Sequence, residues 1–196
     1  MKSLLMLFTV IIYVNFGYTQ ESKFQKKWDF SGRISFGSEN NYGNPGLLFQ
    51  TNLNYQFHKT ISTTGALGFF HSLPELNKEP GAELSTFSAA FIGFNLMHTA
   101  VFNQNKNYVK IQGGALLINT SSIYRNLTLT AFDEFGNPFQ YVVPKQEVLT
   151  KVGYHVGMLG GANLSEKVSF GLSLDIYSYQ IFGDIVTIGI DLGYKF

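Results

Sequence analysis

Three residues in the second half of the chain are of the types that hydrolases use: His155, Ser173 and Asp175. A serine hydroxyl, an imidazole that takes its proton and a carboxylate that orients the imidazole form the triad of acyl-transfer enzymes. If residues 151–163 and 168–178 form a hairpin, positions whose numbers sum to about 330 face each other, which sets His155 opposite Asp175. Ser173 falls on the same face. The three residues are therefore either a triad or a polar cluster inside a barrel, because register alone does not define a triad.

The elements that would position these residues are β-strands. The closing stretch VTIGIDLGYKF alternates strictly between apolar residues and small or polar ones, which is typical of a strand with one apolar face. Comparable alternation predicts eight strands: Trp28–Phe36, Leu47–Phe57, Ile61–Phe70, Ser85–Met97, Tyr108–Ile118, Lys151–Asn163, Val168–Ser178 and Ile185–Phe196. The faces of the fourth strand stay open. Phe87 with Phe91 favours one register, whereas Ile92 with Leu96 favours the other.

Composition supports an all-β domain. The chain has 196 residues, of which 45% are hydrophobic and 14% charged, with 19 Phe, 11 Tyr and 20 Gly. Aromatic residues suit pleated surfaces, and glycine weakens helices. The absence of cysteine excludes disulfides and thiolate metal sites. A formal net charge of +1 gives no reason to expect a nucleic-acid partner.

The amino-terminal segment resembles a secretory signal peptide. Lys2 precedes the apolar run Leu4–Val14, and small residues follow at the positions expected before a cleavage site. We therefore expect residues 1–19 to be a signal peptide and residues 20–196 to be the mature domain. No later segment has 18 uninterrupted apolar residues, so a membrane-embedded mature chain would have to be a closed barrel.

Connections of alternating length predict which ends of the strands share a rim. Those at 58–60 and 164–167 are short, and the one at 98–107 is somewhat longer. The alternate connections are mostly longer: Gly37–Gly46, His71–Leu84, Asn119–Thr150 and Tyr179–Asp184. Short turns on one rim and long loops on the other are typical of outer-membrane barrels. All five prolines fall in the expected long loops, which fits because proline cannot donate to a central ladder.

Together these features resemble the small bacterial outer-membrane β-barrels of the OmpA/OmpX type, and the many Gly and aromatic residues are similar to the outer-membrane barrel domains of Bacteroidetes-type bacteria. The resemblance implies an eight-stranded antiparallel up-and-down transmembrane β-barrel in the outer membrane, in contact with its lipid. It also implies that Tyr194 and Phe196 act as the signal read by the barrel-assembly machinery. It brings no catalytic signature.

The inward face is expected to carry a polar cluster of Arg33, His155, Asp175 and Asp191. Eight strands leave an interior that side chains can fill, so we expect Arg33 and Asp191 to lock the lumen as an ion pair. The other histidines have no partners at metal-ligand spacing, and no cofactor motif is present. We therefore predict no catalytic residues, no metal and no cofactor.

Three other functions stay open at this stage: a lipid-modifying outer-membrane enzyme that uses His155, a small-solute channel, and a secreted soluble ligand-binding barrel. In a soluble barrel the apolar set would point inward around a ligand, whereas in a membrane barrel it points to lipid. Aromatic residues near one rim, such as Trp28, Tyr55 and Tyr194, favour the membrane.

The third long connection is the expected contact surface. Asn119–Thr150 is long for a loop without structure or function, and its alternation with the turn-like DEFGNP could continue the flanking strands as a hairpin. We weigh a lid over the barrel mouth against a docking surface for an unknown extracellular partner. Its candidate contact residues are the aromatic ones: Tyr124, Phe132, Phe135, Phe139 and Tyr141.

Overall fold

The computed structural model describes residues 27–39, 45–73, 86–102, 106–179 and 184–196. Eight strands make up most of them: β1 Lys27–Glu39, β2 Pro45–Gln56, β3 Ile61–Ser72, β4 Thr86–Phe102, β5 Asn107–Phe132, β6 Pro138–Asn163, β7 Val168–Ser178 and β8 Asp184–Lys195. The expected signal peptide lies outside the described residues. Within the described residues, no helix is long and apolar enough to cross a membrane.

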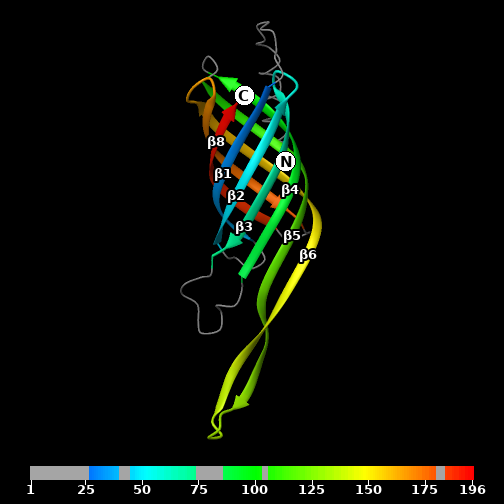
Figure 1. Cartoon of the computed structure of the whole chain (residues 1–196), viewed down its shortest axis with the longest axis vertical. Coiled ribbons are helices and arrows are strands. Elements are labelled where there is room, and N and C mark those ends of the chain that lie inside the picture. Colours follow the sequence, from blue (N-terminus) through cyan, green and yellow to red (C-terminus); the bar gives the residue numbers. More distant parts are fainter. Residues whose placement is uncertain (1–26, 40–44, 74–85, 103–105, 180–183) are drawn as a thin grey trace, which may run out of the picture.

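The strands close into a barrel in sequence order (Figure 1). Each strand pairs antiparallel with the next, and β1 pairs with β8 from Asp29↔Lys195 to Glu39↔Ile185. Closure satisfies the backbone groups of every strand within the wall, which is the requirement for a sheet surrounded by lipid. The predicted eight-stranded antiparallel barrel is confirmed.

Alternation sorts the side chains between the two faces of the wall. On β1, Ile34 is 58% exposed on the outer face, and the adjacent Arg33 is 4% exposed inside. On β4, Phe87 and Phe91 are buried in the interior, while Ile92 is exposed outside. This decides the register that the sequence left open for the fourth strand. An apolar face turned outward over most strands is costly in water and stable in lipid.

The β6–β7 hairpin differs in register from the prediction. His155 faces Tyr177, and Asp175 faces Gly157, so the facing positions are offset by two residues from those expected. The turn causes the offset. The Leu164 N–H donates to the Val168 carbonyl at 2.9 Å, and the Val168 N–H donates to Ser165 Oγ at 3.0 Å. Val168 therefore belongs to the closure of the turn, and the expected pairing of His155 with Asp175 directly across the hairpin was wrong.

Most of the expected third loop is strand. β5 and β6 pair from Asn107↔Ala162 to Phe132↔Pro138, far beyond the last pair between β4 and β5, Thr86↔Ile123. The two strands leave the barrel as a twisted ribbon on the side opposite the end marked C (Figure 1). We call residues 124–145 the β5–β6 ribbon. Of the two possibilities, an unstructured loop or a hairpin that continues the strands, the structure shows the hairpin.

The prediction that every proline lies in a loop was partly wrong. Pro45 is the first residue of β2 and Pro138 the first of β6, and both positions tolerate a missing N–H donor. Pro144 lies within β6, opposite Arg125, where the register shifts before Leu127. A bulge interrupts the ladder locally, so a proline is accommodated there. Pro74 and Pro80 lie outside the described residues.

Residues 133–137 close the ribbon with a defined turn. One Asp133 carboxylate oxygen accepts the N–H groups of Phe135 at 2.9 Å and Asn137 at 2.7 Å. The other accepts the Asn137 side-chain amide at 2.9 Å. Gly136 has a φ of +80°, a conformation that glycine adopts without strain. The tip of the ribbon is thus ordered by its own hydrogen bonds.

Candidate functional site

Asp175 is the centre of a buried polar network inside the barrel. Its carboxylate accepts hydrogen bonds from Arg33 Nη1 at 2.7 Å, from His155 Nε2 at 2.9 Å and from Gln112 Nε2 at 3.2 Å. The four residues come from β1, β5, β6 and β7, so the network ties opposite sides of the wall together. Asp175 is 1% exposed. A carboxylate at that depth is tolerated because several donors replace its water shell.

A second carboxylate shares the same arginine. Arg33 faces Asp191 across the β1–β8 seam, and its Nε lies 3.3 Å from Asp191 Oδ2. Ser31 Oγ donates to the same oxygen at 3.2 Å. The structure thus brings together all four residues of the predicted cluster, with Arg33 bridging two acidic groups.

His155 does not form a triad with Ser173. Its Nε2 contacts Asp175, and its Nδ1 lies 3.1 Å from Asn95 Oδ1, so both ring nitrogens have partners other than the serine. The ring also stacks on Tyr177 with centroids 4.5 Å apart. No hydrogen bond joins Ser173 to His155 among the described residues. Because the imidazole cannot take the serine proton in this arrangement, it lacks the geometry of an acyl-transfer site.

The half of the interior nearest the ribbon is filled by apolar side chains. The residues of this apolar plug are Leu48, Phe70, Phe87, Ala89, Phe91, Leu116, Ile118, Tyr177, Tyr179 and Ile185. The lumen is therefore not polar throughout, which corrects the expectation of a polar filling. A signal for the plug was present in the sequence: Leu48 alternates in register with Gln50, and Leu116 with Gln112, so both share the inward face.

The plug and the network together close the interior. Adding a Cβ at Gly68 would bring it within 2.2 Å of the Phe91 ring, and one at Gly157 within 2.1 Å of an Asp175 oxygen. Glycine is thus favoured where the side chain of the paired residue on the neighbouring strand lies over the wall. A lumen packed to this extent leaves little room for a diffusing solute.

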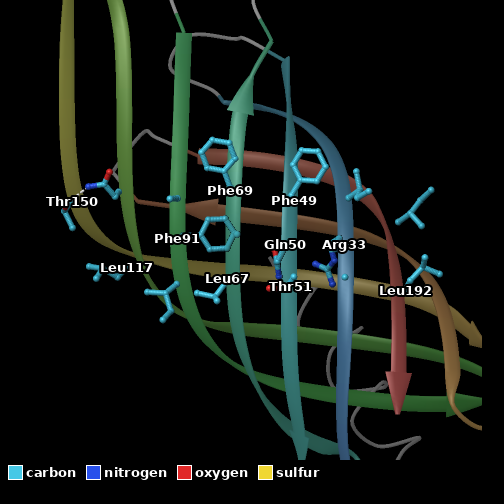
Figure 2. Close-up of a pocket in the computed structure, with 17 residues that line it drawn as sticks. Arg33, Phe49, Gln50, Thr51, Leu67, Phe69, Phe91, Leu117, Thr150 and Leu192 are labelled. Atoms are coloured by element: carbon cyan, nitrogen blue, oxygen red, sulfur yellow. Dashed lines mark hydrogen bonds between the residues drawn. The ribbon is translucent and has the colours of Figure 1, made fainter. Parts of the chain in front are cut away.

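A hollow of roughly 1190 Å³ lies along the wall, lined by residues of β1–β6 and β8 (Figure 2). Most of the side chains that line it face outward and are apolar, among them Phe49, Leu67 and Leu192. Arg33 and Gln50 also border it, although both are buried on the inward face. We assign it no substrate, because its lining is mainly the apolar outer wall.

The aromatic residues at the other predicted sites occupy both ends of the molecule. Phe132, Phe135 and Phe139 are exposed at the tip of the ribbon. The backbones of Tyr124 and Tyr141 lie in its strands, while their side chains lie outside the described part of the structure. Tyr194 and Phe196 pack edge to face at 5.4 Å on the opposite rim, and the Phe196 N–H donates to the Trp28 carbonyl at 3.0 Å.

A closed eight-stranded barrel with an apolar outer face and a packed interior defines the fold class of the small outer-membrane β-barrels. Solved structures of that class are similar to this chain. Neisserial surface protein A superposes with a TM-score of 0.58 at 10% identity, over 87% of this chain and 97% of the other. The amino-terminal barrel domain of Pseudomonas aeruginosa OprF gives 0.52 at 11%, over 88% and 100%.

The attachment invasion locus protein Ail of Yersinia pestis is similar to the same extent. Its TM-score is 0.52 at 14% identity, over 87% of this chain and 97% of the other. Ail has also been solved in complex with the heparin analogue sucrose octasulfate. No protein-family model matches the sequence, and no curated protein is significantly similar to it. The likeness at these identities establishes the shared fold.

Proposed function

We propose that this chain is an integral barrel of the bacterial outer membrane that docks other proteins with the tip of its β5–β6 ribbon. The observation that carries the proposal is the exposure of large aromatic side chains on an ordered turn. Phe135 is 81% exposed and Phe132 68% exposed. Phe132 directly precedes the turn and Phe135 is part of it, and Asp133 stabilises this turn by three hydrogen bonds.

Order at the tip favours binding. An aromatic side chain contributes a large contact area with few rotatable bonds, and a preformed turn reduces the entropy lost when a partner binds. The ribbon also projects away from the barrel, so its tip is placed for contact beyond the lipid surface (Figure 1). Exposed aromatic clusters of this kind mark interaction sites on protein surfaces.

Charge favours a protein partner over a polyanion. The sequence of the ribbon and its turn carries Arg125 and Lys145 as its cations and Asp133 and Glu134 as its acids, so its formal charge balances. A sulfated ligand of the kind bound by the Yersinia protein requires several cations that converge on one face. In its described residues, the tip of the ribbon offers a partner apolar contact area and no cluster of positive charges.

The closed interior supports a surface role over the three alternatives. His155 lacks the contact that a hydrolase would need, and the apolar plug occupies the mouth that a channel would need. The outward apolar face opposes a soluble barrel, which would turn that face inward around its ligand. In this proposal, the barrel anchors the ribbon in the membrane and holds it in a fixed orientation.

Replacing residues 124–145 with a short polar turn tests the proposal. The barrel wall keeps its complete β4–β5 ladder, so insertion and the heat-modifiable gel shift should persist. Cells that display the shortened protein should lose adherence to immobilised protein layers. A variant that fails to insert would show that the ribbon is part of the folding unit, and one that inserts with unchanged adherence would refute docking.

A point variant isolates the tip. The double variant Phe132→Ser and Phe135→Ser should lower the adherence of cells to immobilised protein layers at least tenfold. Aromatic anchors commonly contribute about 2 kcal/mol or more each to binding. The matched control is Thr130→Ser, which changes an exposed residue of β5 without removing an aromatic ring. Equal loss in both variants would show that the ribbon's fold matters and the aromatic tip does not.

A further inference from the structure

Lysines are concentrated on the rim opposite the ribbon. Each short turn there supplies one: Lys59 between β2 and β3, Lys106 between β4 and β5, and Lys167 between β6 and β7. Lys27 begins β1 on the same rim, where it pairs with Gln56 of β2. We call these four residues the lysine rim. Because they come from three turns and a strand end, they are distributed around the barrel.

Hydrogen bonds fix these turns to their neighbours. The Asn163 N–H donates to the Lys106 carbonyl at 2.7 Å, and the Lys195 N–H donates to the Lys167 carbonyl at 2.8 Å. Gln56 Nε2 donates to the Lys59 carbonyl at 2.9 Å. The lysine backbones are thus held in the wall, while Lys27, Lys106 and Lys167 are exposed and Lys59 half-buried.

Six of the eight strands end on the ribbon side without a cation in their described residues. Among the described residues, the ends of β1, β2, β3, β4, β7 and β8 there carry no lysine or arginine, and the cations of that side, Arg125, Lys145 and Lys151, lie on β5 and β6. Of the acidic residues at these strand ends, Glu39 is buried and Asp184 is partly buried. On the lysine rim the described acidic residues are Asp29 and Glu166. Asp29 already accepts a hydrogen bond from Asn54 Nδ2. Among the described residues, the lysines of the lysine rim are therefore spread around the whole barrel, whereas the cations of the ribbon side are confined to β5 and β6.

Aromatic side chains lie directly beside the lysine rim. Trp28 is the only tryptophan of the chain, is half exposed and packs against Tyr55 at 4.6 Å. Aromatic rings at this height mark the interface between acyl chains and headgroups. Lysine side chains that start at the interface extend toward the headgroup layer. The ammonium groups are therefore within reach of lipid phosphates.

We propose that the lysine rim binds the headgroups of anionic phospholipids in the leaflet that surrounds the short turns. This surface is separate from the ribbon, so the proposal does not depend on docking at the ribbon tip. A basic residue close to an anionic membrane surface contributes enough attraction for about a fivefold preference at low salt. The preference should weaken as salt rises, because the Debye length falls to about 3 Å at 1 M salt.

Trp28 provides the measurement, since it is the single tryptophan and lies beside Lys27. The full-length barrel would be reconstituted in phosphatidylcholine vesicles that contain either brominated phosphatidylglycerol or brominated phosphatidylcholine. Bromine on the upper acyl chain quenches a tryptophan that it contacts. We expect the relative binding constant for phosphatidylglycerol over phosphatidylcholine to be about five or more at low salt.

Two variants separate charge from fold. Lys27→Gln with Lys59→Gln should bring the relative constant close to one, whereas Lys27→Arg with Lys59→Arg should keep it. Both variants should retain the heat-modifiable gel shift, which verifies the barrel. Equal quenching by the two lipids in the native protein, or a preference that survives the glutamine substitutions, would overturn the proposal.

Discussion

Replacing Arg33 with methionine should strongly destabilise the barrel. Arg33 is 4% exposed and lies between Asp175 at 2.7 Å and Asp191 at 3.3 Å, so its loss leaves two buried carboxylates without their shared cation. Removing one partner of a buried ion pair typically costs about 3–5 kcal/mol. Asp175 keeps His155 and Gln112 as donors, so we expect a loss near 3 kcal/mol.

The loss should come mainly from Asp191, whose remaining side-chain donor in the described structure is Ser31. Arg33→Met combined with Asp191→Asn should therefore recover at least about 1 kcal/mol, because it removes the unpaired charge. Coupling of this kind is expected for residues in one network and absent between distant sites. The double variant thus distinguishes an electrostatic cost from the loss of a long side chain that packs the lumen.

Urea unfolding in lipid vesicles, followed by Trp28 fluorescence, measures the free energy of unfolding. Trp28 lies on the outer face, so its emission should shift to the red when it leaves lipid. Ser35→Ala is the matched control on the same strand, because Ser35 Oγ is buried without a hydrogen-bond partner in the described structure and should contribute little. A change below about 1 kcal/mol for Arg33→Met would refute the view that the network locks the lumen.

Two further predictions concern the ends of the molecule. Phe196→Ser should reduce membrane insertion more than Lys195→Ser. Phe196 is exposed on the outer rim, whereas Lys195 Nζ donates to Asn163 Oδ1 at 2.7 Å. Equal membrane levels of the two variants would exclude a role of Phe196 in assembly. Hydrogen bonds from Asn137 and Phe135 lower the pKa of Asp133 below its usual 3.8. The Asp133 carboxylate therefore stabilises the ribbon turn fully above pH 3.8, and this stabilisation is lost as the pH falls through the lowered pKa. An NMR titration of the Asp133 carboxyl should give a midpoint below 3.8 that Asn137→Ala raises toward it, and an unshifted midpoint would contradict the turn geometry.

The wall of the barrel was predictable because a strand repeats its faces every two residues. Along β8, Ile188, Ile190 and Leu192 are all exposed outside, and Thr187 and Asp191, which alternate with them, are buried inside. One such stretch defines both faces, and the short turns define the order of neighbours. Closure then follows, since an apolar sheet with free edges cannot be accommodated in lipid.

The interior was predictable only in part. Alternation assigns Arg33, Asp175 and Asp191 to the inward face, but it does not say which of them touch. Contact depends on turn geometry, and the turn that closes between Leu164 and Val168 sets the register in which His155 faces Tyr177 and not Asp175. His155 still reaches Asp175 because diagonal neighbours across a hairpin lie within range of long side chains.

The apolar plug was missed for a different reason. A polar inward face was inferred from the middle of each strand, whereas the inward residues change type toward the ribbon end, from Gln112 to Leu116 and Ile118 on β5. This change from polar to apolar inward residues has a physical consequence, and it is not visible in the average composition of the inward face. The plug lies between the buried network and the water above the barrel mouth. It keeps Asp175 and Arg33 at a low local dielectric, where their attraction is strong and water cannot compete for them. A filled interior of this kind leaves the ribbon and the two rims as the surfaces on which the chain can act.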